Sequence, residues 1–473
     1  MSSYSGFSSR CNYNWTGKIL KKNYIMIKKL GFGSYAVVWL CYSLKHKKCF
    51  AIKILNPEDY ISGQKEIDIF QKINKLKCKY ILSMIEYFDI EVPNDQIENN
   101  KDKYYDDKYK HICIILELMY CSIYDIIKQC HKTGKYLPLN FIKNIIHQVL
   151  LATNVLHKNN IIHTDIKPEN ILVSLDNATE ISKIIGLDND LIIISNYFNK
   201  TDINSLILKL MKELTVKNKK KYNNNKLKQI AIYELVKKIL LNLKPNQNLD
   251  QNINQNSNIN DDDSIEYKSI DDYKIKRYEI TDSESESELS DNEELLDCEL
   301  LNKLKKISIK LSDLGTCIEK DKINYNTIQT RHYRAPEVIL KLKYNEKCDI
   351  WSIGCCIYEL LTLELLFNPD ETNTISCDRF HICDFISKLG LIPKKMIRDS
   401  SKKDIFYKKN GFIRGLNDIN INPLFTDIED IRIKIYNQDQ KILLLFELME
   451  KMLLFDLNKR SSAHECLQHI LFK

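Results

Sequence analysis

Residues His163 to Asn170 read HTDIKPEN and place three different functional groups close together. They are the carboxylate of Asp165, the ammonium group of Lys167 and the amide of Asn170. In phosphoryl transfer from ATP, a carboxylate accepts the proton of the attacking hydroxyl, a lysine neutralises the migrating phosphoryl group, and an amide oxygen holds Mg²⁺. The spacing of these groups makes phosphoryl transfer the first chemistry to test against the rest of the sequence.

A glycine-rich segment near the N-terminus is suited to holding the triphosphate. In LGFGSYAVV, Gly31, Gly33 and Ala36 occupy the positions of a G-x-G-x-x-G pattern, and Val38 follows. Glycines at such positions let the backbone lie against phosphate oxygens, because no Cβ stands in the way. A glycine turn between two strands, with no ligand, explains this short stretch alone at least as well.

Three further segments follow in the order that phosphoryl transfer requires. Lys53 ends the strand-like FAIK and could pair with the α- and β-phosphates, while Glu66 on the next helix could fix that lysine. SDLG supplies Asp313 as a second metal-binding carboxylate, and APE at residues 335–337 closes the segment. Each segment is weak evidence alone, but their correct order makes them jointly strong evidence.

The elements that must position these groups fall into two parts. Residues 23–56 are rich in β-branched residues and predict strands, and residues 62–76 have the apolar spacing of a helix. Residues 111–119 predict a buried strand, and residues 140–160 predict a long amphipathic helix. The first part is strand-rich and the second helix-rich, which predicts two lobes with a cleft between them.

An insert interrupts the second lobe between about Asp176 and Lys306. Its sequence is polar and low in complexity, and it contains blocks of like charge. Such sequence buries too little apolar surface to repay the entropy of ordering, so we expect part of it to be disordered. Residues 202–214 and 227–243 are exceptions, because their apolar residues have helical periodicity. We expect these two stretches to be helices that pack onto the lobe or onto a partner.

The composition excludes several classes of protein. The 473 residues are 44% hydrophobic and 28% charged, and their formal net charge of +7 is too mild for a protein that coats nucleic acid. No apolar run approaches the roughly 20 residues of a membrane helix, and no secretory signal is visible. The 15 cysteines form no C-x-x-C pair and are odd in number, which favours reduced thiols over a disulfide framework or a zinc site.

These properties predict where the protein acts. We expect it in the cytoplasm, the nucleus or both (those of a host cell if the protein is viral), neither secreted nor spanning a membrane. We expect no membrane partner and no direct nucleic-acid binding, and we expect a monomer.

The ordered motifs resemble those of eukaryotic protein kinases over nearly the whole chain apart from the insert. Within the CMGC group, the sequence resembles the SR-protein kinases, which phosphorylate serines in arginine/serine-rich proteins. The matching stretches are YIMIKKLGFGSYAVVWL, IIHTDIKPENIL, DLG with IQTRHYRAPEVIL, CDIWSIGCCIYELLTLELLF, and LGLIP followed by FYKKNGFIRGL. Asp165 and Asp313 lie 313 − 165 = 148 residues apart, where an ordinary kinase takes roughly 20. The SR-protein kinases also carry a long spacer at this point.

The resemblance implies an α+β, bilobal protein-kinase fold. It implies an N-lobe with a small antiparallel β-sheet and one main helix, a larger helical C-lobe, and a long, partly disordered insert. The implied boundaries are 1–118 for the N-lobe with a short extension, 119–175 and 307–473 for the C-lobe, and 176–306 for the spacer.

The resemblance also implies roles for individual residues, with ATP as substrate and Mg²⁺ as its metal ion. The implied catalytic residues are Asp165, Lys167 and Thr330, and the implied metal ligands are Asn170 and Asp313. The implied ATP-binding residues are Leu30, Gly31, Gly33, Val38, Ala51, Lys53, Glu66, Glu117 and Met119. Leu116 resembles a gatekeeper, Asp349 a buried carboxylate that steadies the catalytic loop, and Glu337 with Arg460 a buried ion pair.

Thr164 occupies the place where many kinases have an arginine that anchors a phosphate on the activation segment. Threonine cannot pair with that phosphate. We therefore expect the segment from Asp313 to Glu337 to be held by packing, and the enzyme to be active as synthesised. Thr316, Tyr325 and Thr327 leave a modification site in the segment open.

The substrate preference stays less defined. SR-protein kinases recognise arginine-rich substrates partly through acids on the helix before the LGLIP turn, and two of those positions hold Phe380 and Ser387. Asp378 and Asp384 lie close enough in sequence to substitute. Two alternatives remain: a CMGC kinase with a different substrate that lacks Arg-Ser repeats, and a nucleotide-binding pseudokinase scaffold. The pseudokinase is disfavoured because Lys53, Asp165, Asn170 and Asp313 are all present.

Overall fold

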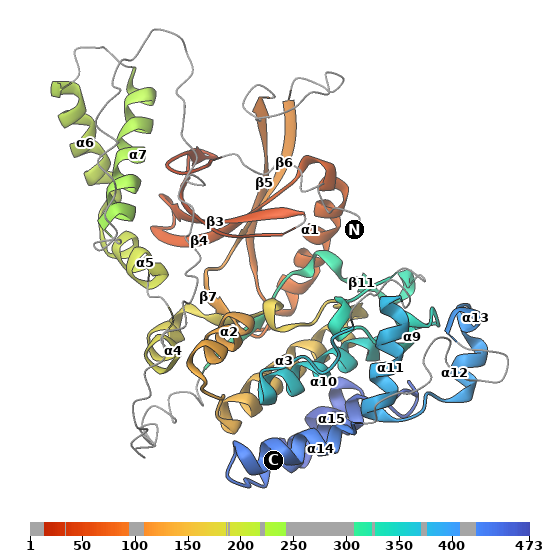
Figure 1. Cartoon of the computed structure of the whole chain (residues 1–473). Coiled ribbons are helices and arrows are strands. Elements are labelled where there is room, and N and C mark those ends of the chain that lie inside the picture. The colour runs from red at the N-terminus through yellow and green to blue at the C-terminus, as the bar shows by residue number, and fades with distance from the viewer. Residues whose placement is uncertain are drawn as a thin grey trace. The chain divides into compact units, whose positions relative to one another are not determined.

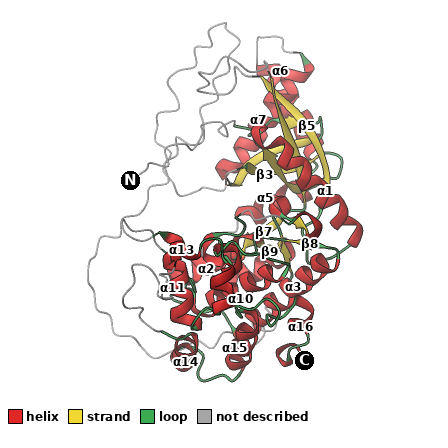
Figure 2. Cartoon of the chain, turned by 90° about the vertical axis from the view of Figure 1, so that its right-hand side faces the viewer, coloured by secondary structure: helices red, strands yellow, loops and turns green. Residues whose placement is uncertain are grey.

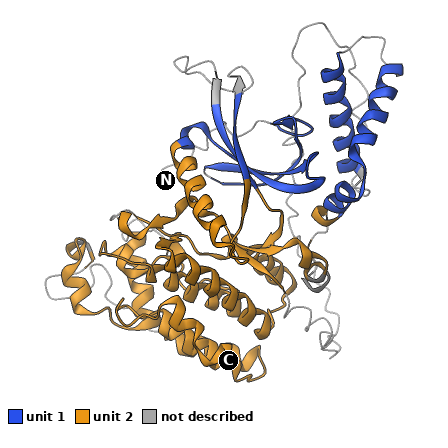
Figure 3. Cartoon of the chain, turned by 180° about the vertical axis from the view of Figure 1, so that it is seen from behind, with its two compact units in different colours: residues 1–60, 86–115, 193–296 blue, residues 61–85, 116–192, 297–473 orange. Residues whose placement is uncertain are grey.

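The structure, a computed structural model, describes most of the chain (Figure 1). The described residues are 14–33, 35–93, 108–185, 187, 190–217, 223–242, 307–323, 327–369, 376–406 and 422–473. The chain forms two compact units (Figure 3). Unit 1 comprises residues 1–60, 86–115 and 193–296, and unit 2 comprises residues 61–85, 116–192 and 297–473.

Unit 1 is built on a six-stranded sheet with the strand order β1-β2-β3-β4-β6-β5. Its strands are β1 (Ile19–Leu20), β2 (Tyr24–Phe32), β3 (Ala36–Ser43), β4 (Lys48–Leu55), β5 (Met84–Pro93) and β6 (Lys108–Leu116). Alternate residues of these strands, among them Trp39, Cys41, Phe50 and Ile52, form a buried hydrophobic cluster on one face. The predicted small antiparallel sheet is therefore confirmed.

Three helices of the insert belong largely to unit 1. They are α5 (Asp190–Lys200), α6 (Ile203–Lys217) and α7 (Asn224–Asn242), of which α6 and α7 lie side by side (Figures 1 and 3). The buried residues of α7, which include Leu227, Ala231, Leu235 and Ile239, recur at helical spacing. Both stretches with helical periodicity are thus helices.

Helix α5 packs against the sheet. The ring of Phe198 lies 5.3 Å from that of Tyr42 on β3, and the backbone N–H of Cys49 on β4 donates a 3.0 Å hydrogen bond to Oδ1 of Asn199. Neither α5 nor α4 (Ala178–Ile185) was anticipated from the sequence. The described part of the insert is therefore largely helical up to Asn242, and its residues 243–306 lie outside the described residues.

Unit 2 is dominated by helices (Figure 2). Its helices are α1 (Tyr60–Leu76), α2 (Ile123–Thr133), α3 (Leu139–Lys158), α4, α9 (Pro336–Ile339), α10 (Lys347–Thr362), α11 (Cys377–Leu389), α12 (Lys394–Asp399), α13 (Lys403–Phe406), α14 (Leu424–Lys434), α15 (Lys441–Met452) and α16 (Ala463–Leu467). Helix α10 is buried along nearly its whole length, and α3 and α15 pack against it. The predicted helical lobe is confirmed.

Two small sheets in unit 2 carry the segments that the sequence singled out. One has the order β10-β9-β7, formed by β7 (Met119–Ser122), β9 (Ile171–Ser174) and β10 (Ile309–Leu311). The other pairs β8 (Ile161–Ile162) with β11 (Ile318–Glu319). These strands bring HTDIKPEN and SDLG together across the insert.

No helix among the described residues is long and apolar enough to cross a membrane.

Candidate active site

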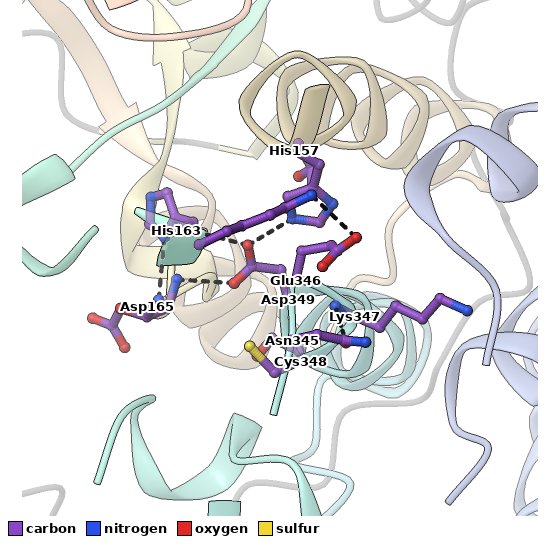
Figure 4. Close-up of polar contacts among 12 residues, drawn as sticks. His157, His163, Asp165, Asn345, Glu346, Lys347, Cys348 and Asp349 are labelled. Carbon is purple, nitrogen blue, oxygen red and sulfur yellow. Dashed lines mark hydrogen bonds and ion pairs between the residues drawn. The ribbon is translucent and has the colours of Figure 1, made fainter. Parts of the chain in front are cut away.

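The loop that follows β8 is held from below by Asp349, a buried residue of α10 (Figure 4). Its carboxylate accepts hydrogen bonds of 2.8 Å from the backbone N–H groups of both His163 and Thr164, and one of 2.9 Å from Nε2 of His157. These bonds satisfy a fully buried charge, which would otherwise be costly to desolvate. They fix the backbone immediately before Asp165.

His163 links this loop to the segment that contains Asp313. Its Nε2 lies 2.9 Å from the carbonyl oxygen of Ser312, and its Nδ1 accepts a 3.2 Å hydrogen bond from the backbone N–H of Asp165 (Figure 4). Because Nδ1 accepts, Nε2 is the nitrogen that carries the proton in a neutral ring. The imidazole is thereby a bridge between two candidate site segments.

Four predicted residues meet at the carboxylate of Asp165. Oδ1 accepts hydrogen bonds from the backbone N–H (3.0 Å) and the hydroxyl (2.6 Å) of Thr330, and Oδ2 lies 2.9 Å from Nζ of Lys167. Lys167 also donates a 2.7 Å bond to the Thr330 hydroxyl, and Nδ2 of Asn170 lies 3.1 Å from Oδ2. Asp165, Lys167, Asn170 and Thr330 therefore form one connected cluster, although Thr330 lies far along the chain.

Asn170 and the Asp313 segment are also joined. The carbonyl oxygen of Asn170 accepts hydrogen bonds from the backbone N–H (2.8 Å) and the hydroxyl (3.0 Å) of Ser312. Asp313 has a left-handed backbone, with φ of 58°. A Cβ added at Gly315 would lie 3.1 Å from Oε2 of Glu66 and 3.7 Å from Oδ1 of Asp313, so the Glu66 carboxylate reaches this segment from α1.

The donor set at this place suits Mg²⁺. Among the described residues, no group of three or more His, Cys, Asp or Glu side chains could hold a metal ion by itself. Magnesium is usually bound through one or two protein oxygens together with substrate phosphates. Nδ2 of Asn170 donates hydrogen bonds to the carbonyl oxygen (2.8 Å) and the carboxylate of Asp165. The other amide atom, Oδ1 of Asn170, therefore remains as a possible ligand for Mg²⁺.

In unit 1, four of the residues predicted to contact ATP share one face of the sheet, namely Gly31, Val38, Ala51 and Lys53. Gly31 is paired with Val38 across β2 and β3, and Val38 with Lys53 across β3 and β4. Ala51 is paired with Leu40 on the same strands, so its side chain points to the same face as those of Val38 and Lys53. Leu30 is at a register shift next to Gly31.

Neither the backbone conformation nor the packing of the protein requires glycine at positions 31 and 33. Neither Gly31 nor Gly33 has a positive φ, and no described atom lies within 4 Å of a Cβ added at either position. Space on the outside of a hairpin is what an approaching phosphate needs. The face that carries Val38 and Lys53 also carries Tyr42 and Cys49 further along the strands, where α5 covers it.

The predicted adenine-binding segment lies between β6 and β7. The side chain of Glu117 is engaged within unit 2: its Oε1 accepts a 2.8 Å hydrogen bond from the backbone N–H of Ser83 and lies 2.8 Å from Nζ of Lys310. Met119 begins β7 and is paired with Ser174. The side chain of Glu117 is thus used to hold the segment.

Thr164 has a positive φ of 68° and is almost fully buried. Its hydroxyl donates a 2.7 Å hydrogen bond to the carbonyl oxygen of Thr316, and the Thr316 hydroxyl donates a 3.3 Å bond to the carbonyl oxygen of His163. Ile318 pairs with Ile162 where β11 joins β8. The start of the predicted activation segment is therefore attached to the loop by side-chain and backbone bonds.

Gln329 was not singled out from the sequence, yet it positions Thr330. It is buried with a φ of 66°, and its Nε2 donates to the carbonyl oxygen of Cys348 (2.9 Å) and the hydroxyl of Ser352 (2.8 Å). Its Oε1 accepts a 3.0 Å hydrogen bond from the backbone N–H of Ala335. Nothing in the local sequence pattern signals this role, because Cys348 and Ser352 lie on α10 and Ala335 lies just before α9.

A second missed feature concerns two carboxyl groups, Glu169 within HTDIKPEN and Glu359 on α10. The pKa of Glu359 is raised to about 7, mainly by burial and also by the negative charge of Glu169, while a 2.7 Å hydrogen bond from the hydroxyl of Tyr333 opposes the shift. Desolvation also raises the pKa of Glu169, with contributions from Asp165 and Asp125. Both carboxyl groups are therefore harder to ionise than ordinary glutamates, mainly because of desolvation.

Asp378, one of the two acids suggested for substrate docking, is engaged inside unit 2. It forms an ion pair with Arg331 and another, of 2.8 Å, with Lys402. Its pKa is lowered by these two cations, although burial opposes the shift. The matching stretch FYKKNGFIRGL lies almost wholly outside the described residues.

Glu337 and Arg460 form the buried ion pair that the resemblance implied. The two guanidinium nitrogens lie 2.7 and 2.8 Å from the two carboxylate oxygens, in the bidentate geometry that favours such pairs. Both side chains are essentially inaccessible to solvent.

Comparison with known proteins matches residues 24–188 and 299–472 to the family described as Protein kinase domain. The gap in this match falls within the insert. The match covers well over half of the chain and includes Gly31, Lys53, Asp165 and Asp313.

Named relatives are similar to this chain in sequence over most of their length. The chain is 26% identical to Protein kinase dsk1 of Schizosaccharomyces pombe, over 93% of this chain and 79% of the relative. It is 30% identical to protein L205 of Acanthamoeba polyphaga mimivirus, over 96% and 88%. It is 25% identical to Serine/threonine-protein kinase SRPK of Physarum polycephalum, over 96% and 86%. The resemblance to the SR-protein kinases is confirmed.

Proposed function

Because the chain belongs to the protein kinase family and is an ATP-dependent protein serine/threonine kinase, we propose that Asp165 accepts the proton of the substrate hydroxyl. The observation that carries this proposal is the cluster of Lys167, Asn170 and Thr330 around its carboxylate. Thr330 and Lys167 hold the two oxygens in a fixed orientation, which is what a general base needs. The 2.7 Å bond from Lys167 to Thr330 keeps the ammonium group beside the place where the phosphoryl group would pass.

For nucleotide binding, the proposal assigns the metal to Oδ1 of Asn170 and the carboxylate of Asp313. These two residues would hold Mg²⁺, which would neutralise the charge that develops on the phosphates. Gly31, Gly33 and Lys53 would contact phosphates, with Val38 and Ala51 beside them on the sheet face and Leu30 next to Gly31 in the chain. Support comes from the shared face of Gly31, Val38 and Lys53 and from the open space outside both glycines.

Three further residues complete the proposed nucleotide site. The backbones of Glu117 and Met119 would hold adenine, since the Glu117 side chain is already bonded to Lys310 and Ser83. Glu66 would orient the phosphate-binding lysine, and its position against Gly315 supports a place next to the metal-binding segment.

We further propose that catalysis does not require phosphorylation of the activation segment. The hydrogen bond from Thr164 to Thr316 and the β8–β11 pairing attach the segment without any phosphate. Recombinant enzyme treated with a phosphatase should keep its kcat, and complete loss of activity after treatment would refute this part.

We propose that the enzyme prefers serines near arginine. The support is the exposed carboxylate of Glu169 in the same loop as Asp165, which a guanidinium group of a substrate could approach. One relative carries the name SRSF protein kinase 3, at 25% identity over 96% of this chain and 87% of the mouse protein. A different CMGC preference has its own support, because Asp378 is already paired with Arg331 and Lys402.

Transfer of radiolabelled phosphate from ATP to a peptide panel would test these proposals. We expect an Arg-Ser repeat peptide to be the best substrate, and acidic or proline-directed peptides to be poor. Asp165→Asn should lower kcat about 100- to 10,000-fold, the contribution of a general base. Glu169→Gln should raise KM for the Arg-Ser peptide while leaving kcat close to that of the wild type. A faster rate on an acidic or proline-directed peptide than on the Arg-Ser peptide would favour the alternative preference.

A further inference from the structure

Helix α1 carries Glu66. The chain that follows this helix is hydrogen-bonded to β10, directly before the metal-binding segment that contains Asp313. The backbone N–H of Leu311 on β10 donates a 2.8 Å hydrogen bond to the carbonyl oxygen of Tyr80, and Leu82 donates a 2.9 Å bond back to the carbonyl oxygen of Leu311. Tyr80 and Leu82 lie in the chain that leaves α1. This end of the helix is therefore fixed by main-chain bonds shortly before Asp313.

An ion pair also connects α1 to the residues that follow Asp313 in the chain. Nζ of Lys72, on the exposed side of α1, lies 2.6 Å from Oε2 of Glu319 on β11. Lys322 approaches the other carboxylate oxygen, also at 2.6 Å, and both cations lower the pKa of Glu319. The two lysines differ in origin, because Lys322 belongs to the segment itself and only Lys72 belongs to the helix.

Glu319 is a firm attachment point because its own backbone is held. Glu319 pairs with Ile161 where β11 joins β8, directly before HTDIKPEN. The next residue, Lys320, donates a 2.9 Å backbone bond to the carbonyl oxygen of Asn160, and its ammonium group lies 3.1 Å from Glu346. A force on the Glu319 side chain is thus transmitted to the loop that contains Asp165.

We propose that the ion pair between Lys72 and Glu319 positions α1, so that Glu66 stays against Gly315 and Asp313 in the unphosphorylated enzyme. Both are positioning residues, since neither touches a reacting group. Glu319 gives the activation segment a negative charge that pairs with the helix, so no phosphate has to be added for that purpose. This inference rests on the proposed function, in which the segment works without phosphorylation.

The size of the effect follows from exposure. The side chains of Lys72 and Glu319 are 49% and 25% exposed, and exposed ion pairs contribute little because solvent and salt screen them. We expect Lys72→Met or Glu319→Gln to lower kcat about two- to fivefold at saturating ATP and peptide. KM for the peptide should not change, because the pair lies outside the proposed substrate contacts.

The chain provides a matched control. Lys322→Met removes an ion pair of the same length from the same carboxylate but leaves the link to α1 intact, so kcat should stay at the wild-type value. The double variant Lys72→Met/Glu319→Gln should lose no more kcat than the worse single variant, since both changes break one interaction. Raising KCl should reduce kcat of the wild type more than that of Lys72→Met.

Kinetics of the phosphatase-treated proteins decide the matter. Equal losses in Lys322→Met and Lys72→Met, or additive losses in the double variant, would overturn the inference. Wild-type kcat in Lys72→Met would overturn it as well. A dephosphorylated wild-type enzyme without activity would instead contradict the proposed function, so the two failures are distinguishable.

Discussion

The hydroxyl of Thr164 donates a 2.7 Å hydrogen bond to the carbonyl oxygen of Thr316, across the insert that separates these residues in the chain. An arginine at this position would present a charge for a phosphate, whereas the threonine makes a neutral bond directly to the segment. The segment is thereby attached at its first turn after DLG. What holds this turn is present in the unmodified chain.

The first prediction concerns that hydroxyl. Thr164→Val keeps the β-branched shape but leaves the Thr316 carbonyl oxygen without this donor, and loss of a typical hydrogen bond costs about 1 kcal/mol. We expect kcat to fall about fivefold or more, with no recovery on treatment with an activating kinase. Thr164→Ser keeps a hydroxyl and should retain most activity; equal activity of the Val and wild-type enzymes would contradict the prediction.

The second prediction concerns the buried ion pair. Arg460→Met leaves the carboxylate of Glu337 buried without its partner, and loss of one member of such a pair costs about 3–5 kcal/mol. We expect a large decrease in the melting temperature in differential scanning calorimetry. Arg398→Met, which breaks an exposed pair with Asp399, is the control and should melt like the wild type. A small shift in the melting temperature of Arg460→Met would contradict the prediction and show that the site relaxes around the unpaired carboxylate of Glu337.

The third prediction concerns pH. Burial and the charge of Glu169 raise the pKa of Glu359 from 4.5 to about 7 in the folded protein. The folded state therefore holds this proton at pH values where the unfolded state has released it, so stability falls as pH rises from about 4.5 to about 7. The loss is at most about 3 kcal/mol, from the size of the shift.

Glu359→Gln tests this sign. Glutamine keeps the size of the side chain and an acceptor for Tyr333 but cannot ionise. In urea titrations across this pH range, the stability of the wild type relative to that of the variant should decrease as pH rises. A difference that is constant with pH, or that grows, would mean that the carboxyl group titrates normally.

The fourth prediction concerns α5 on the sheet of unit 1. Phe198 is fully buried against Tyr42, so Phe198→Ala should destabilise the unit by about 3–5 kcal/mol. Hydrogen exchange should become faster at β3 and β4, which carry Val38 and Lys53. Leu208→Ala on α6 removes an exposed side chain and is the control. Unchanged exchange in Phe198→Ala would indicate that α5 does not support these strands.

Much of this protein was determined by the sequence alone. The strands of residues 23–56 and the helices at 202–214 and 227–243 follow from local periodicity, which selects between strand and helix within a few residues. The candidate groups Lys53, Asp165 and Asp313 were found because ordered motifs carry them, and Asp165 indeed meets Lys167, Asn170 and Thr330. Their catalytic roles stay predictions.

Only the tertiary structure decided which charges meet. Lys72 finds Glu319 although 247 positions separate them, and the Cys49 backbone finds Asn199 across 150 positions. Asp378 was a candidate for substrate docking in the sequence, but folding gives it Arg331 and Lys402 as partners. Glu359 gains its raised pKa from burial and from Glu169, neither of which its neighbours in sequence reveal. Periodicity is a local property of the chain, whereas Coulomb energy and desolvation depend on distances and burial that exist only after the chain has folded.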